Sequence, residues 1–129
     1  MSLQIALDTS SYVEFCKGDP LVLEQVQTAR KIFIPFIVLG ELRAGFLCGV
    51  RQENNSKILT RFLNSARTEI LFADEQTTHH YARLFSYLKD KGKPIPTNDL
   101  WIAALVVQHD LILSTKDKHF KNLPQLPLI

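Results

Sequence analysis

The sequence predicts an α/β fold in which one parallel sheet is covered by helices on both faces. Short apolar runs alternate with longer segments whose apolar residues recur every three or four positions, an order typical of β-α-β units. The apolar share of 46% and the charged share of 22% are those of an ordinary globular chain. With 129 residues the chain can build one core but not two, so we expect a single domain over residues 1–129.

The first strand is predicted at residues 3–7, an apolar run that ends at Asp8. The polar residues 9–11 follow it, and such residues commonly begin a helix. A second helix is expected over residues 20–29, which open on a proline, a residue favoured at the first helical position.

The second strand is predicted at residues 31–35 and is stopped by its final proline. Apolar residues then recur at helical spacing, which predicts a helix over residues 38–49. Residues 54–66 form a further amphipathic helix, with a polar face opposite an apolar one. These last two helices could pair as an exposed hairpin.

The second half of the chain repeats the alternation and adds a short tail. The helix predicted at residues 77–91 is closed by Gly92, because glycine readily adopts the left-handed conformation that ends a helix. Residues 93–96 are the one clear linker. In order, we expect a strand at 69–73, helices at 77–91 and 97–109, a strand at 111–113, a turn at 117–123 and an extended piece at 126–129.

The chain also carries signs of a soluble, cytoplasmic protein. No apolar run approaches the roughly 20 residues that a membrane-spanning helix needs. The start lacks the basic leader and long apolar segment of a secretory signal. Cys16 and Cys48 lie far apart without Cys-x-x-Cys spacing, so we expect buried free thiols rather than a zinc site or a disulfide.

Four acidic residues fall where a parallel sheet gathers its ligands. Asp8 ends the first strand and Asp117 lies just beyond the fourth, and the carboxyl ends of parallel strands meet at one edge. Asp99 lies in the first turn of a helix, whose dipole favours a negative charge, and faces the same edge. Glu41 has apolar neighbours at helical spacing, so its carboxylate should be partly buried and need a cation, a metal ion or a raised pKa.

Each acid taken alone has a simpler explanation. Asp8 and Asp117 could cap the segments that follow them, Asp99 could be a helix-start charge, and Glu41 could reach solvent. Together the four carboxylates suit Mg²⁺ or Mn²⁺ rather than zinc, and these ions serve phosphodiester hydrolysis. The four histidines are expected to be surface or capping residues rather than ligands: His79, His80, His109 and His119.

Basic residues flank the segments that carry the acids. Residues 43–67 hold five basic side chains against one acidic one, and a second cluster comprises Lys116, Lys118 and Lys121. Solvated helix faces explain many such clusters, but this placement suits a phosphate backbone that approaches a metal ion. Lys116, Lys118 and Arg43 are therefore candidates for contact with a nucleic-acid backbone, although Arg43 could instead pair with a carboxylate.

Four motifs stand in a fixed order between Asp8 and Phe120. They are Leu7-Asp-Thr-Ser10, Gly40-Glu-Leu-Arg-Ala-Gly45, Thr97-Asn-Asp-Leu-Trp-Ile-Ala-Ala104 and Leu113-Ser-Thr-Lys-Asp-Lys-His-Phe120. Read together, they resemble the PIN-domain family and, within it, the VapC-type toxins. The resemblance implies a three-layer α/β/α fold with a parallel, five-stranded sheet. It also implies an endoribonuclease that depends on Mg²⁺ or Mn²⁺ and leaves 5′-phosphate and 3′-hydroxyl ends.

The resemblance also assigns residues and partners. Asp8, Glu41, Asp99 and Asp117 match the family's acidic positions, which act in metal binding and catalysis. Neighbouring polar positions that hold water or orient carboxylates are matched by Thr9, Ser10, Asn98 and Thr115, although many relatives have asparagine in place of Ser10. Such toxins are typically homodimers held by helices like those between residues 36 and 66. They are inhibited by a cognate antitoxin, in a heterotetramer or larger complex.

Other functions remain open at this point. An RNA-processing nuclease, or a non-catalytic RNA- or protein-binding module, could share this fold and pocket. A receiver-type regulatory domain also places aspartates at strand ends, but it needs an acceptor aspartate on a middle strand. The second strand ends at Pro35, and Asp74 after the third has no supporting residues, so this class ranks last.

Overall fold

A four-stranded parallel sheet forms the centre of the protein in the computed structural model, which describes residues 3–129. Met1 and Ser2, which the predicted domain includes, lie outside the described residues. The strands are β1 (Gln4–Leu7), β2 (Lys31–Pro35), β3 (Thr68–Leu71) and β4 (Ile112–Ser114), in the order β3-β2-β1-β4. Every neighbouring pair is parallel, which confirms the predicted sheet type.

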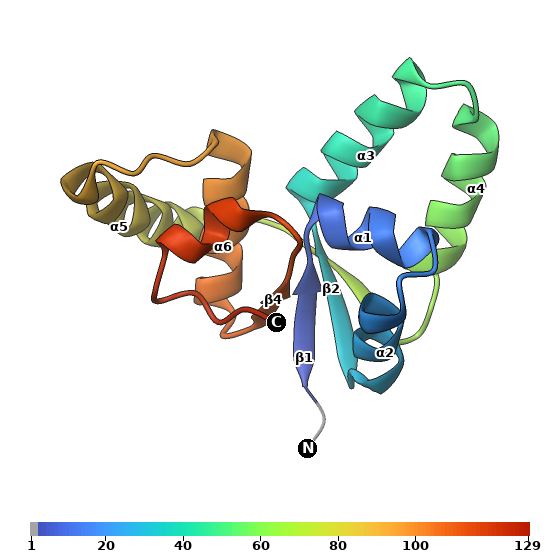
Figure 1. Ribbon diagram of the computed structural model, residues 1–129, viewed down its shortest axis with the longest axis horizontal. Coiled ribbons are helices and arrows are strands. Elements are labelled where there is room, and N and C mark those ends of the chain that lie inside the picture. Colours follow the sequence, from blue (N-terminus) through green and yellow to red (C-terminus); the bar gives the residue numbers. More distant parts are fainter. Residues whose placement is uncertain (1–2) are drawn as a thin grey trace.

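Helices cover both faces of this sheet, so the three-layer α/β/α architecture is confirmed (Figure 1). One side carries α5 and α6, and the other carries α1, α2 and α4, while α3 and α4 project together as a hairpin. The helices are α1 (Thr9–Cys16), α2 (Pro20–Thr28), α3 (Phe36–Cys48), α4 (Gln52–Leu63), α5 (Glu75–Lys91) and α6 (Thr97–Gln108), and the 3-10 turn η1 spans Lys118–Asn122. Across residues 3–129, no helix is both long and apolar enough to cross a membrane.

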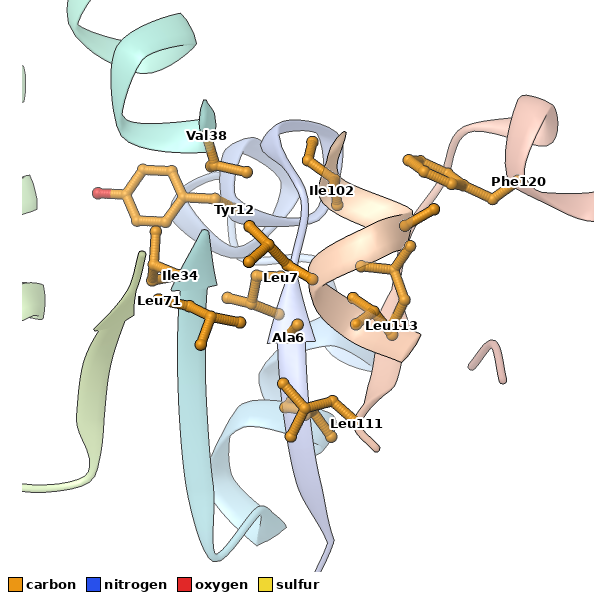
Figure 2. Packing of buried hydrophobic residues seen from close by; sticks show 14 of the residues in the cluster. Ala6, Leu7, Tyr12, Ile34, Val38, Leu71, Ile102, Leu111, Leu113 and Phe120 are labelled. Atoms are coloured by element: carbon orange, nitrogen blue, oxygen red, sulfur yellow. The ribbon is translucent and has the colours of Figure 1, made fainter. Parts of the chain in front are cut away.

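The core explains why the strands appear in the sequence as continuous apolar runs. Successive side chains of a strand point to opposite faces, and here both faces are covered by helices. Three consecutive β1 residues, Ile5 to Leu7, are therefore buried. Figure 2 shows side chains of β1 packed with Val38 of α3 on one side and Ile102 of α6 on the other. The sheet is thus a rigid base for the residues that follow the carboxyl ends of its strands.

The strand order creates a crevice at one place on that edge. From β1 the chain adds β2 and then β3 on one side, whereas β4 returns to the opposite side of β1. In open α/β sheets, ligands bind at such a switch point, beyond the carboxyl ends of the strands. The residues that follow β1 and β4 therefore meet at the predicted ligand edge.

The sheet has four strands, where five were implied. In the tail, only Leu128 forms a parallel bridge, opposite Leu113. The Leu113 amide donates to the carbonyl of Pro127 at 2.9 Å, and the Ile129 amide donates to the carbonyl of Leu113 at 3.0 Å. Pro127 itself has no N–H to donate, so the ladder does not extend into a full strand.

The start of α5 also differs from the prediction, by two residues. The helix begins at Glu75 because Asp74 caps it: Oδ1 of Asp74 accepts from the Thr77 amide at 3.2 Å. The hydroxyl of Thr77 accepts from the Asp74 amide at 2.9 Å in return. This reciprocal pair is a capping box, and it satisfies two amides that the helix start leaves without partners.

The prediction that Cys16 and Cys48 are buried was wrong. Both thiols are free, as expected, but both are exposed. Each cysteine is the last residue of its helix, α1 or α3. The prediction rested on the general tendency of free cysteines to be buried, and that tendency does not hold for these two residues at exposed helix ends.

Arg67 has a structural role that its place in the basic cluster conceals, and we predict that Arg67→Met destabilises the fold. Its Nη1 donates to the carbonyls of Val26 at 3.1 Å and Ala29 at 2.5 Å, which joins the end of α2 to the start of β3. Loss of these charged hydrogen bonds should lower the free energy of unfolding by about 1.5–3 kcal/mol in urea titrations. Arg61→Met, at a position as exposed as that of Arg67, is the control and should change it by less than about 0.5 kcal/mol. Equal effects of the two variants would contradict this role.

Candidate functional site

A pocket of about 400 Å³ lies at the switch point between β1 and β4. It brings together four carboxylates from distant parts of the chain. Its lining comprises Asp8, Thr9, Ser10, Val13, Glu14, Glu41, Asp99, Ile102, Lys116 and Asp117. A larger hollow on the α3–α4 hairpin, lined by residues such as Gly49 and Arg61, contains none of the four acids. The acid-lined pocket is therefore the candidate site.

Asp8 is held firmly at the start of α1. It is 4% exposed and caps the helix, since its Oδ1 accepts from the Ser11 amide and from the Ser10 hydroxyl, each at 2.8 Å. Its Oδ2 accepts from the hydroxyl of Thr115 at 2.5 Å. Burial raises the pKa of the Asp8 carboxyl, an effect that these hydrogen bonds oppose and the nearby charge of Asp117 reinforces. One lone pair of Oδ2 stays free for a further partner.

Glu41 lies on α3 and is half-buried, in keeping with the expectation from its apolar neighbours. Its Oε1 accepts from the hydroxyl of Thr9 at 2.6 Å. Its Oε2 lies 3.4 Å from the amide nitrogen of Asn98, which donates to it. Residues from α1 and α6 therefore orient a carboxylate of α3, and each Glu41 oxygen retains an unused acceptor site.

Asp99 and Asp117 face each other across the pocket, and His119 lies between them. Nδ1 of His119 is 3.3 Å from Oδ2 of Asp99 and 3.0 Å from Oδ1 of Asp117. Asp117 caps η1, since its Oδ1 also accepts from the His119 amide at 2.9 Å. Burial raises the pKa of the Asp99 carboxyl, followed by repulsion from Asp117 and Glu41, while the hydrogen bond to His119 lowers it.

Thr115 links two of the acids directly. Its hydroxyl donates to Asp8 and accepts from the Asp117 amide at 2.9 Å. Ser10 makes a similar link, because its hydroxyl donates to Asp8 and accepts from the Lys116 amide at 3.0 Å. The polar residues that the motifs placed beside the acids thus lie in hydrogen-bond contact with them.

Two features of the site were missed in the sequence. The first is His119, assigned to the surface, which is exposed but touches two of the acids. The spacing Asp117-x-His119 was the available signal, because an aspartate that caps a tight turn brings the side chain two positions later next to its carboxylate. The second is a buried chain of polar groups behind Asp8, in which Ser114 Oγ lies 3.0 Å from Ser11 Oγ and donates to Gln25 Oε1 at 2.6 Å.

The three residues that the sequence offered for RNA binding lie on different parts of the surface. Lys116 lines the pocket, and its Nζ lies 3.7 Å from the carboxylate of Asp19. Lys118 is exposed on η1 and lines a neighbouring hollow with Lys121. Arg43 is exposed on α3. Of the three, only Lys116 therefore lies in the lining of the acidic pocket.

The donor set of the pocket fits a hard divalent cation. Carboxylate oxygens dominate it, and such oxygens suit Mg²⁺ and Mn²⁺. The raised pKa of both Asp8 and Asp99 shows that these carboxylates lie where a negative charge is unfavourable. A cation bound among them would relieve that cost.

Known proteins match this chain over nearly its whole length. Residues 5–126 match the family model described as PIN domain. Ribonuclease VapC4 of Mycobacterium tuberculosis is 32% identical over 96 residues, which is 74% of each chain. Ribonuclease VapC2 of Rickettsia felis is 36% identical over 107 residues, covering 82% of this chain and 78% of the relative.

Solved structures give the same result. The VapBC2 complex from Rickettsia felis bound to a promoter DNA fragment contains a chain that matches with a TM-score of 0.88 at 30% identity, over 98% of both chains. The VapBC-1 complex from nontypeable Haemophilus influenzae matches with a TM-score of 0.87 at 26% identity, over 98% of this chain and 97% of the other. The fold and the order of its elements are therefore shared with these chains.

The raised pKa values predict that the metal-free protein gains stability when one pocket charge is removed. Native Asp8 and Asp99 hold their protons more tightly than the unfolded chain does, so stability falls as the pH rises through the range above 3.8, their ordinary value. Asp99→Asn should therefore raise the free energy of unfolding in EDTA at neutral pH. This gain should shrink as the pH falls toward 3.8.

Added Mn²⁺ should reverse the order of stability, so that the unsubstituted chain becomes more stable than Asp99→Asn in urea titrations. The unsubstituted chain should gain about 2.7 kcal/mol at a free metal concentration one hundred times its Kd, and the variant should gain less. Glu24→Gln, on the exposed surface of α2, serves as the control for loss of a charge. An Asp99→Asn protein that is less stable than the original in EDTA would contradict the argument.

Proposed function

The chain belongs to the PIN domain family and is of the VapC type, and from this membership we propose that it is a metal-dependent endoribonuclease, the toxin of a toxin–antitoxin pair. The observation that carries the proposal is the meeting of Asp8, Glu41, Asp99 and Asp117 in one pocket at the switch point of the sheet. Several relatives of this chain are named ribonucleases. An all-carboxylate site of this kind suits phosphodiester hydrolysis.

The four carboxylates would hold Mg²⁺ or Mn²⁺. When bound, such an ion lowers the pKa of a coordinated water and neutralises charge that develops on a phosphate. The chain's own residues supply the placement: Thr115 and the start of α1 fix Asp8, and Thr9 fixes Glu41. Glu41 keeps an open acceptor site on each oxygen, so it can orient an attacking water and take its proton.

The rim of the pocket would receive the RNA backbone. Lys116 in the pocket lining, Lys118 beside the neighbouring hollow and the exposed Arg43 of α3 would offer positive charge to a polyanion that the acidic interior otherwise repels. Contacts to phosphate position a nucleic acid without reading its sequence, so these residues set affinity and register. Cleavage leaves a 5′-phosphate when water attacks phosphorus and the 3′ oxygen departs with a proton.

A second chain is expected to cover part of the surface. The matched structures are complexes described as VapBC, so we assign this chain a cognate antitoxin as partner and a homodimer as its own state, in a heterotetramer or larger complex. Large apolar side chains remain exposed at the tip of the α3–α4 hairpin, including Leu47 and the fully exposed Val50. Such side chains commonly mark interaction surfaces.

The nuclease proposal predicts that Asp8→Asn and Asp99→Asn each abolish metal-dependent RNA cleavage. Asparagine keeps the size of the side chain and the helix cap at position 8 but removes the charge that holds the ion. The loss should be about a hundredfold or more, because several kcal/mol of transition-state stabilisation depend on the bound ion. The assay follows a fluorescent RNA in Mg²⁺, in Mn²⁺ and in EDTA.

The controls separate loss of chemistry from loss of fold. Circular dichroism should show folded variants, and Glu24→Gln should cleave at the original rate, because Glu24 is an exposed residue of α2. Full cleavage by either pocket variant would refute the proposed site. A folded protein that binds RNA but turns over neither RNA nor DNA with any divalent ion would favour the non-catalytic binding module.

The toxin role predicts an inhibitor encoded by a neighbouring gene. Co-expression of this chain with the product of a short adjacent reading frame should yield a stable complex on size exclusion. The complex should cleave the fluorescent RNA at least tenfold more slowly than the free chain. Absence of such a gene, together with normal growth of cells that express the chain alone, would instead indicate an RNA-processing nuclease.

A further inference from the structure

His119 is an exposed residue, but its ring faces the partly buried carboxylates of Asp99 and Asp117. Its side chain is 50% exposed, yet Nδ1 lies 3.3 Å from Asp99 and 3.0 Å from Asp117. Within residues 3–129, no lysine or arginine forms an ion pair with either carboxylate. The imidazole nitrogen therefore occupies the position where a cation partner would be expected.

The spacing of these atoms matches that of neighbouring ligands around one ion. Ligands at right angles, each about 2.1 Å from a divalent cation, lie about 3 Å apart. The two distances from Nδ1 to the carboxylate oxygens have this size. One donor atom each from Asp99, Asp117 and His119 also lies within 4.8 Å of the others.

The local structure holds the ring in this position. The His119 amide donates to the same Asp117 oxygen that Nδ1 approaches, so the η1 turn fixes both the backbone and the ring beside that carboxylate. A neutral imidazole can carry its proton on Nε2 and leave Nδ1 as a donor to metal. Because half of the side chain is exposed, water can solvate the Nε2 proton.

We propose that Nδ1 of His119 is a direct ligand of the divalent ion held by Asp99 and Asp117. This part of the pocket is then a mixed nitrogen and oxygen site that favours Mn²⁺ over Mg²⁺, because imidazole suits transition metals better than it suits Mg²⁺. The inference rests on the proposed function, since it presumes that the pocket holds a metal ion. It extends the four-carboxylate site by one residue and names the ion that the site prefers.

The test is spectroscopic and needs no RNA. Mn²⁺ is titrated into the intact protein by calorimetry, and the loaded sample is examined by electron spin echo envelope modulation. We expect modulation from a directly bound ¹⁴N nucleus, which is replaced by the ¹⁵N pattern when the protein is labelled with ¹⁵N-histidine. The chain has four histidines, so variants must assign the signal.

Two substitutions distinguish ligation from hydrogen bonding. His119→Ala removes the ring, whereas His119→Asn keeps an amide that can donate to Asp117. Both should lose the nitrogen modulation, and the Mn²⁺ affinity should fall about tenfold or more, a fall that exceeds the one for Mg²⁺. His79→Gln, on the exposed face of α5, is the matched control and should retain the signal and both affinities.

The outcomes separate the two proposals. Mn²⁺ that binds without histidine modulation, or an Asn variant with the original preference for Mn²⁺ over Mg²⁺, overturns the role of His119 and leaves the nuclease standing. A wild-type chain that binds no Mn²⁺ or Mg²⁺ overturns both proposals. If the modulation survives in His119→Ala but disappears in His79→Gln, the nitrogen ligand is His79 and not His119. That result also overturns the inference.

Discussion

The burial of carboxylates at one point of the sheet is the constraint on which the rest of the structure depends. Asp8 and Asp99 both lie where burial and a neighbouring charge raise the pKa. An arrangement of this kind opposes folding, chiefly because burial disfavours a charged carboxylate and to a smaller extent because like charges repel one another. The chain offsets the cost with hydrogen bonds aimed at the charged oxygens, from the amide that starts α1 and from the hydroxyl of Thr115. The acids are therefore held in place by polar contacts and not by attraction to each other.

These contacts can hold the acids only because the elements behind them are rigid. Asp8 follows β1, which has neighbours on both sides in the sheet and is buried on both faces. Asp99 opens α6, a helix whose residues from Leu100 to Val106 are almost all buried. A site built on the ends of packed strands and helices keeps its geometry better than one built on loops. The apolar core thus supplies the free energy that an unfavourable cluster of charges requires.

The sequence predicted those parts of the molecule that depend on periodicity and chain order. Apolar runs and helical spacing placed the strands and helices within a few residues, and the parallel sheet then predicted one edge for Asp8 and Asp117. Features that depend on the surroundings of a side chain at or beyond the end of a helix or strand could not be predicted from these patterns. The exposure of Cys16 and Cys48 and the contact of His119 with the acids are of this kind. The missing fifth strand belongs here too, since it depends on how a proline-containing tail meets β4.

The charge of the pocket links metal binding to RNA binding. The pocket gathers four carboxylates, and the lysine of its lining, Lys116, already faces Asp19. A phosphate that enters such a pocket would meet repulsion in the absence of cations, whereas two divalent ions would cancel the charge of the four acids. If the pocket holds ions as proposed, each ion strengthens the binding of RNA, and by thermodynamic linkage RNA strengthens the binding of the ions by the same factor. A low affinity for metal in the free protein is then compatible with full occupancy in the complex, because the substrate supplies the remaining oxygen ligands and part of the binding free energy.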